Sequence, residues 1–151
     1  MNKPIKSLSK TPTFGFTLIE MTIVVLIMAI LAAEAVPAYL GLRTRVVLRS
    51  SAELMLGALA EGRLQAIKEN RRVTIDFAPL LTSIGTQSTV SGNNLGTIII
   101  EPRLATLTDP TAAGSVDFSR DGYKIRFGVT AIGQGYICVP ATFKSPGYSA
   151  C

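Results

Sequence analysis

The most apolar part of the chain lies near its N-terminus. Residues 21–33 are apolar or nearly so, and the apolar character continues to about residue 40, with interruptions at Glu34 and Pro37. About 20 mainly apolar residues are enough to cross a bilayer as a helix. The pattern therefore predicts a membrane-spanning helix over residues 16–40.

After this segment the apolar positions are spaced as in an amphipathic helix, from Leu42 to about Asn70. Small or apolar residues recur at steps of three or four, and the charged residues lie largely opposite them. The predicted stripe consists of Leu48, Ala52, Met55, Leu59, Gly62 and Ala66. Asn70 suits the C-terminal cap of this helix. We expect the stripe to face a core, and Leu64, which breaks the pattern, to face a neighbour.

The remainder of the chain alternates between short β patterns and loops. Five strands are expected, at residues 72–77, 97–101, 116–119, 123–127 and 134–139. Two stretches rich in turn-forming residues, 79–94 and 102–114, are predicted as loops. The Asp121-Gly122 pair between the third and fourth strands indicates a tight hairpin. Together these features predict an α+β domain over residues 41–151, with an antiparallel sheet packed on the helix stripe.

The N-terminus combines basic residues, a small residue and the apolar segment in an unusual order. Lys3, Lys6 and Lys10 precede Gly15, and no acid accompanies them. A secretory signal places its apolar region before the cleavage site, so that the apolar part is discarded. Cleavage after Gly15 would instead remove the charges and keep the apolar helix, with Glu20 near its start.

The run Gly-Phe-Thr-Leu-Ile-Glu at residues 15–20, followed by the apolar helix and Pro37, resembles the type III signal of the type IV pilin and pseudopilin superfamily. The resemblance implies that residues 1–15 are a leader peptide, cut by a prepilin peptidase between Gly15 and Phe16. It also implies N-methylation of Phe16. Residues 16–40 would form the transmembrane and assembly helix, and 41–151 a periplasmic domain.

Glu20 is the residue of this segment that most needs an explanation. A carboxylate at the centre of a membrane helix costs about 2.5–3.5 kcal/mol on insertion scales. The resemblance places Glu20 against the new Phe16 amine of a neighbouring subunit, which would neutralise both charges and favour one register. The alternative is an interfacial acid satisfied within its own chain. Pro37 should kink or loosen the helix, because proline lacks a backbone donor and clashes with the preceding turn.

Three further features resemble parts of the superfamily. Residues 56–77 and the hairpin at 119–127 are similar to the GspH/FimT group of minor pseudopilins and pilins. The cysteine pair near the C-terminus resembles the disulfide-bounded loop of many type IV pilins. In an exported domain a disulfide between Cys138 and Cys151 is the default interpretation, and free thiols are the alternative. The bond would close a loop of 14 residues and stabilise the fold by roughly 3 kcal/mol.

Charge and chemistry narrow the function classes. The formal charge is +5, and removing residues 1–15 would take three of the 15 basic residues and none of the ten acids, which leaves +2. That balance is too mild to imply a nucleic-acid partner by itself. The chain has no histidine, which excludes histidine-based triads and metal sites. Asp117 and Asp121 could bind calcium as a pair, but a turn role is favoured. We therefore expect no enzyme activity, no metal and no cofactor.

Two clusters of cations leave alternatives open. Arg43, Arg45 and Arg49 follow the apolar segment. They would meet lipid headgroups, acids of adjacent subunits or only solvent. Arg120, Lys124 and Arg126 form a local basic patch on the hairpin, whereas residues 133–151 carry only Lys144 as a cation.

The expected function is a structural one, as a minor pilin or minor pseudopilin of a type IV pilus or a type II secretion pseudopilus, in its initiating or tip complex. The expected partners are the prepilin peptidase, other subunits, the inner-membrane assembly platform and inner-membrane lipid. The N-terminus would be cytoplasmic and the C-terminal domain periplasmic. The alternatives are a FimT-like pilin that captures DNA during natural transformation, and a major pilin.

Overall fold

The computed structural model describes residues 15–143 and 147–151 of the 151-residue chain. The described residues fall into two compact units, the first ending at Ala38 and the second spanning Tyr39–Cys151. Lys3, Lys6 and Lys10 of the predicted leader, and Lys144 of the C-terminal loop, lie outside the described residues. The helix α1 (Leu18–Glu69) contributes residues to both units, and everything else that is described from Tyr39 onward belongs to the second unit.

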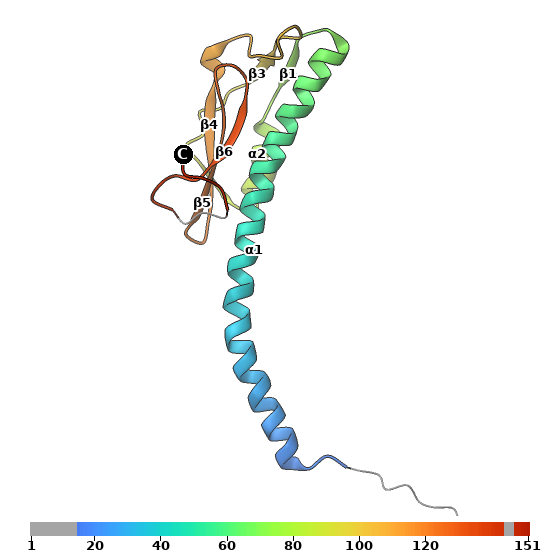
Figure 1. Ribbon diagram of the computed structural model, residues 1–151, viewed down its shortest axis with the longest axis vertical. Coiled ribbons are helices and arrows are strands. Elements are labelled where there is room, and N and C mark those ends of the chain that lie inside the picture. Colours follow the sequence, from blue (N-terminus) through green and yellow to red (C-terminus); the bar gives the residue numbers. More distant parts are fainter. Residues whose placement is uncertain (1–14, 144–146) are drawn as a thin grey trace, which may run out of the picture. The chain divides into compact units, whose positions relative to one another are not determined.

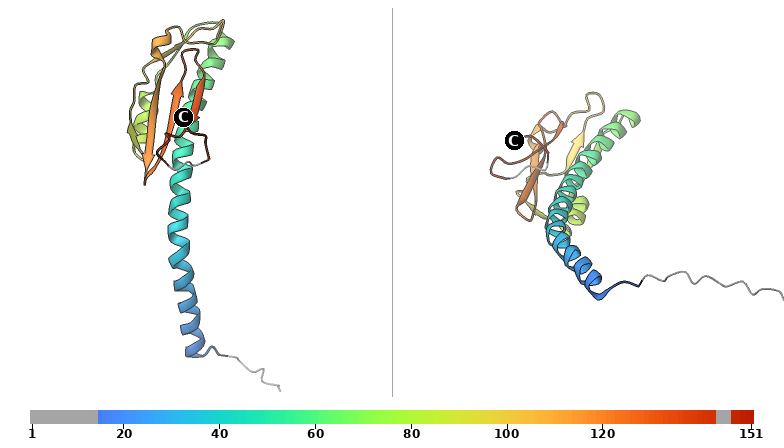
Figure 2. Two further views of the ribbon diagram at one scale, coloured as in Figure 1. Left: turned by 60° about the vertical axis from the view of Figure 1, so that its left-hand side comes forward. Right: turned by 60° about the horizontal axis from the view of Figure 1, so that its bottom comes forward.

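The globular unit, Tyr39–Cys151, has the predicted α+β architecture. In Figures 1 and 2 its antiparallel sheets lie along the second half of α1. All six residues of the predicted stripe, from Leu48 to Ala66, are buried there, together with Thr44 and Ser51. Glu53, Glu61, Lys68 and Leu64 are exposed. The amphipathic pattern therefore predicted correctly which face of the helix is covered.

The C-terminal end of α1 is closed by Asn70, as predicted. Asn70 has a φ of 47°, in the left-handed region that asparagine tolerates better than most residues. Its N–H donates to the Ile67 carbonyl at 3.3 Å, and the Arg71 N–H donates to the Ala66 carbonyl at 3.3 Å. This pair of hydrogen bonds is the Schellman arrangement, which satisfies the carbonyls left over at a helix end.

The strands form two antiparallel sheets. One pairs β1 (Val73–Ile75) with β3 (Ile98–Ile100), with Val73 opposite Ile100. The other has the order β2-β4-β5-β6, in which β2 (Thr89–Ser91) and β6 (Gly135–Cys138) are the edges. All five predicted strands are present, and β2 is an addition. The second sheet is centred on the long hairpin of β4 (Gly114–Arg120) and β5 (Tyr123–Val129).

The hairpin turn is the predicted Asp121-Gly122 pair. Both residues have positive φ, 50° and 81°. A two-residue turn of this kind matches the right-handed twist of the flanking strands, and it needs residues that tolerate the left-handed region. The turn fixes the hairpin register, with Arg120 opposite Tyr123 and Phe118 opposite Ile125.

The prediction that residues 79–94 form a loop is wrong. They contain most of the short helix α2 (Ala78–Gly85) and the whole of β2. Pro79 occupies the first turn of α2, where its missing N–H is not needed, and the Asp76 carboxylate accepts the Ala78 N–H at 3.0 Å. Ile84 is buried in the core. The second predicted loop, 102–114, contains the 3-10 turn η1 (Pro110–Ala112).

One core joins these elements. The α1 stripe, the inner faces of both sheets and α2 all contribute buried side chains to it. The largest fully buried ones are Phe77, Phe118, Phe127, Leu48, Met55 and Leu59. The rings of Phe77 and Phe127 have centroids 6.1 Å apart in a tilted arrangement, which aromatic pairs favour. This core holds the helix and the hairpin together and so fixes the surfaces described below.

Candidate functional site

The predicted cleavage position lies just outside the helix. Gly15, Phe16 and Thr17 are not helical, and α1 begins at Leu18. Gly15 is exposed, and a Cβ atom added to it would meet no atom within 4 Å. The Phe16 side chain is 74% exposed. The bond between Gly15 and Phe16 is therefore accessible and free of helical hydrogen bonding.

Thr17 caps the start of α1. Its hydroxyl accepts the Glu20 N–H at 3.2 Å, and its carbonyl accepts the Met21 N–H at 3.2 Å. A threonine at the N-cap followed by a glutamate three residues later is a capping-box sequence. The Thr-x-x-Glu spacing could have predicted this cap, but the sequence analysis did not use it. The same short motif thus defines where the retained helix would begin.

The Glu20 carboxylate lies in the first turn of α1. A negative charge there interacts favourably with the helix dipole. Among residues 15–143 and 147–151, the Glu20 carboxylate takes part in no ion pair or side-chain hydrogen bond. The helix dipole therefore partly stabilises the Glu20 charge within its own chain, which is the alternative given in the sequence analysis. A full positive charge would have to come from outside the described residues.

The first part of α1 exposes its apolar side chains on every side. One stretch of the helix is long and apolar enough to cross a membrane, and none of that stretch is buried. The large apolar side chains left exposed in residues 15–38 are Phe16, Leu18, Ile19, Met21, Ile23, Val24, Val25, Leu26, Ile27, Met28, Ile30, Leu31 and Val36. A helix that is apolar all round is stable only when lipid or other helices surround it.

Pro37 lies within α1, which remains helical on both sides of it. Proline has no N–H, so the Ala33 carbonyl lacks its usual partner four residues on. The predicted kink or loosening of the helix at this position stays a prediction.

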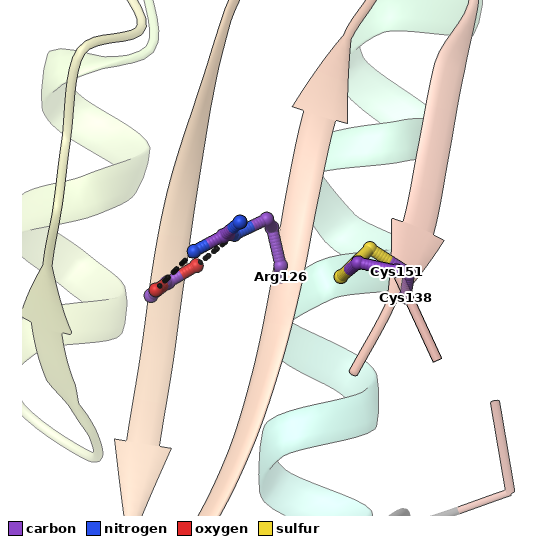
Figure 3. The surroundings of a disulfide bond; sticks show 4 residues. Arg126, Cys138 and Cys151 are labelled. Atoms are coloured by element: carbon purple, nitrogen blue, oxygen red, sulfur yellow. Dashed lines mark hydrogen bonds and ion pairs between the residues drawn. A yellow bond between two sulfur atoms is a disulfide. The ribbon is translucent and has the colours of Figure 1, made fainter. Parts of the chain in front are cut away.

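The predicted disulfide is present. Cys138 at the end of β6 is bonded to Cys151, with the Cα atoms 5.0 Å apart (Figure 3). The bonded segment also pairs with the sheet through its backbone, because Val139 donates to the Ser149 carbonyl at 2.9 Å and Cys151 donates to the Val139 carbonyl at 3.0 Å. The described ends of the C-terminal loop are thus fastened to the strand that precedes it.

A third attachment joins this loop to α1. The Tyr148 hydroxyl donates to the Glu53 carboxylate at 2.9 Å, and the Arg49 guanidinium lies 5.7 Å from the centre of the Tyr148 ring. Arg49 also donates to Glu53 at 2.7 Å. These hydrogen bonds, the one from Arg49 first, lower the pKa of the Glu53 carboxyl. Burial, followed by the hydrogen bond to Glu53, raises the pKa of the Tyr148 hydroxyl.

The cations of the hairpin have partners within the chain. Arg126 binds the buried Asp117 carboxylate with two hydrogen bonds, at 2.6 and 3.0 Å (Figure 3). Lys124 lies 3.8 Å from the same carboxylate and 4.7 Å from the centre of the Phe143 ring. Arg120 donates to the Gln87 carbonyl at 2.8 Å. The predicted basic patch is therefore largely engaged in holding the sheet together.

The two acids considered for calcium have separate roles. Asp117 is paired with Arg126, whereas the Asp121 carboxylate accepts the Thr44 hydroxyl at 2.7 Å. Within the described part of the chain, no group of three or more histidine, cysteine, aspartate or glutamate residues is placed to hold a metal ion.

The chain matches no protein-family model, no curated protein and no solved structure.

Proposed function

We propose that this protein is a structural subunit of a filament, a minor pilin or minor pseudopilin, and that it assembles through its N-terminal helix. The observation that carries the proposal is the combination at residues 15–38. An accessible Gly15–Phe16 bond precedes a capped helix whose apolar side chains are all exposed, and one acid lies in the first turn of that helix. We further propose that the protein is not an enzyme.

In this mechanism the membrane stores the subunit until assembly. A prepilin peptidase cuts after Gly15, and the new amine of Phe16, after N-methylation, carries a positive charge. The Glu20 carboxylate of one subunit pairs with the Phe16 amine of the next. The pair removes two uncompensated charges from an apolar setting, and the apolar helices replace lipid with one another. The charge pair favours one axial position between neighbours, because a shift along the helix would separate the charges.

The same proposal assigns a place in the cell. The N-terminus faces the cytoplasm, residues 16–40 lie in the inner membrane, and the globular unit lies in the periplasm, where an oxidising environment maintains the Cys138–Cys151 bond. The partners are the peptidase, other pilin or pseudopilin subunits, the assembly platform and the surrounding lipid. The orientation of the chain in the membrane is part of the proposal. So is the kind of filament, which is a type IV pilus or a type II secretion pseudopilus.

The DNA-binding alternative receives less support. DNA affinity depends on cations that are free to neutralise phosphates. On the hairpin, Arg126 and Lys124 share the Asp117 carboxylate, and Arg120 is bonded to a main-chain carbonyl. We therefore favour the structural role over DNA capture, and a minor over a major subunit on the resemblance of residues 56–77 to the GspH/FimT group.

The deciding test begins with the mass of the native protein extracted from membranes. We expect a chain that begins at Phe16 and carries one added methyl group. A chain that retains residues 1–15, or that begins beyond the apolar helix, would overturn the proposal. A second arm compares Glu20→Ala with Glu34→Ala. The first variant should be inserted and cut but fail to enter sheared filaments, and the second should assemble normally.

A further inference from the structure

A cleft of about 440 Å³ lies at the base of the globular unit, between the first turns of its helix and the β4–β5 turn. Its walls come from two parts of the sequence, Leu40–Thr44 on α1 and Arg120–Tyr123 at the hairpin. All of these residues belong to the unit Tyr39–Cys151. Sequence reasoning did not find the cleft, because nothing local to residues 40–44 indicates that the hairpin turn packs against them.

Two contacts join the helix and the hairpin beside the cleft. The Thr44 hydroxyl, on a residue only 4% exposed, donates to the Asp121 carboxylate at 2.7 Å. Arg45 donates to the Tyr123 hydroxyl at 3.1 Å and lies 5.2 Å from the centre of the Tyr123 ring. Residues two apart on a helix do not share a face, so Arg45 fixes Tyr123 from one side while Arg43 lines the cleft from the other.

The side chains that line the cleft carry a net single positive charge. Arg43 and Arg120 contribute two cations, and Asp121 contributes one anion. The Asp121 charge is already compensated by the Thr44 hydroxyl and by Arg120, whose Nε atom lies 3.4 Å from it. Arg43 is exposed and makes no ion pair or hydrogen bond within the described residues. A guanidinium of this kind presents two parallel donors to a phosphate.

The remaining wall is apolar and lies at the C-terminal end of the predicted membrane segment, residues 16–40. Leu40 is 53% exposed, and Gly41, which follows it, adds no side chain. A ligand that suits this cleft therefore combines a single negative charge with an apolar part. In the proposed topology the membrane-spanning stretch ends at about residue 40, which would place this wall against lipid.

We propose that this cleft binds the headgroup phosphate of an anionic glycerophospholipid, with Arg43 as the phosphate ligand and Leu40 against the glycerol and first acyl carbons. Arg45 is a positioning residue that holds Tyr123. The binding would fix the depth and rotation of the unassembled subunit in the membrane. The inference rests on the membrane anchor of the proposed function, and it does not require cleavage, methylation or filament assembly.

The test uses the full chain in detergent or nanodiscs, with bound lipid counted by native mass spectrometry. Phosphatidylglycerol should remain bound where phosphatidylcholine is lost. The Arg43→Gln variant should weaken phosphatidylglycerol binding about tenfold, which is the effect of about 1.4 kcal/mol. Arg63→Gln is the matched control, because Arg63 is on the same helix but outside the cleft. Arg43 makes no contact that the fold needs, so its loss should leave the circular dichroism spectrum unchanged.

Competition separates lipid from free anion. Millimolar inorganic phosphate or glycerol phosphate should displace little of the bound lipid, because the apolar wall contributes nothing to these competitors. Complete displacement by inorganic phosphate would overturn the lipid assignment in favour of a free-anion site. If phosphatidylcholine binds as well as phosphatidylglycerol, or if Arg43→Gln binds phosphatidylglycerol as tightly as the parent, the cleft is not an anionic-lipid site and the proposal is wrong. Failure of the proposed function is seen separately, as a retained leader or as filaments that form without Glu20.

Discussion

The two halves of α1 differ in apolar content and in what covers them. In residues 16–38 the large apolar side chains are exposed on all faces. In residues 44–66 the apolar stripe is buried under two sheets and α2, and the exposed face mixes charged residues with a few apolar ones such as Leu54 and Leu64. Met28 is 64% exposed and Met55 is fully buried, although both are methionines of the same helix. The first half needs a covering from outside the chain, and the second half has one within it.

This difference separates two kinds of information. A stripe with a period of 3.6 residues indicates a core made by the same chain, because only one face must be covered. Apolar residues on all faces indicate lipid or other helices. The position of Glu20 matters only in a helix surrounded by lipid or other helices, where an unpaired carboxylate costs free energy. The predictions below test each half of the helix against the other.

The largest effect is expected at the cleavage position. Gly15→Leu should abolish processing, because a peptidase that accepts a small residue before the cut has no room for leucine. The intact mass would then exceed that of the mature chain by residues 1–15, and no Phe16 amine would form. Gly15→Ala is the control and should still be processed. A mature-length chain from Gly15→Leu would indicate a different cut site.

The next largest effect is expected from the alanine substitution of Met55, compared with that of Met28. Met55→Ala should lower the free energy of unfolding of the globular unit by about 2–5 kcal/mol, since it leaves a cavity in the core. Met28→Ala should leave that free energy unchanged within error. Urea unfolding of the detergent-solubilised protein, followed by the near-ultraviolet circular dichroism of its tyrosines, measures both. An equal loss in the two variants would mean that both halves are covered by the chain itself.

The disulfide should stabilise only the second half. Replacing both Cys138 and Cys151 by serine should lower the free energy of unfolding by roughly 3 kcal/mol, because the unfolded chain regains the freedom of the closed loop. Cleavage after Gly15 should proceed as before. The same urea experiment with and without reductant on the unmodified chain provides the control, and the reduced protein should match the double variant.

Much of the globular unit could be predicted from the sequence, because its signals are local. The stripe from Leu48 to Ala66, the Asn70 cap and the Asp121-Gly122 turn each depend on a few adjacent residues. The elements missed, α2 and β2, depend on distant ones. β2 exists because Val90 lies opposite Phe118 on β4, and α2 is held by the burial of Ile84 in the core. Residues 79–94 are rich in turn-forming residues, and this composition is typical of a loop.

The candidate site shows the opposite balance. The roles of Gly15, Phe16 and Glu20 are predicted from their order in the sequence, and the groups that would act on these residues belong to other molecules. The cleft below the hairpin was not predictable, because the Thr44–Asp121 contact joins residues 77 positions apart. Thr17, by contrast, carried a recognisable capping signal that was overlooked.

The smallest effect concerns the contact between the C-terminal loop and α1. Arg49 and Tyr148 lower the pKa of Glu53 in the folded chain, so protons bind more tightly to the unfolded chain. This contribution to stability is present above the ordinary glutamate pKa and is lost as the pH falls through the lowered folded value. Glu53→Gln should therefore show a slightly shallower loss of thermal stability below about pH 4.5 than the parent. Identical acid profiles would show that the contact is not formed in solution.

The burial of the α1 stripe by strands that come much later in the chain has a consequence for biosynthesis. Ribosomes make proteins from the N-terminus, so Leu48, Met55 and Leu59 are completed well before the β5 residues Ile125 and Phe127 that help to cover them. Until then the nascent polypeptide carries an uncovered apolar stripe from residue 48 to residue 66. Chains that stop short of residue 123 never acquire their cover, and cellular quality control should remove them rapidly.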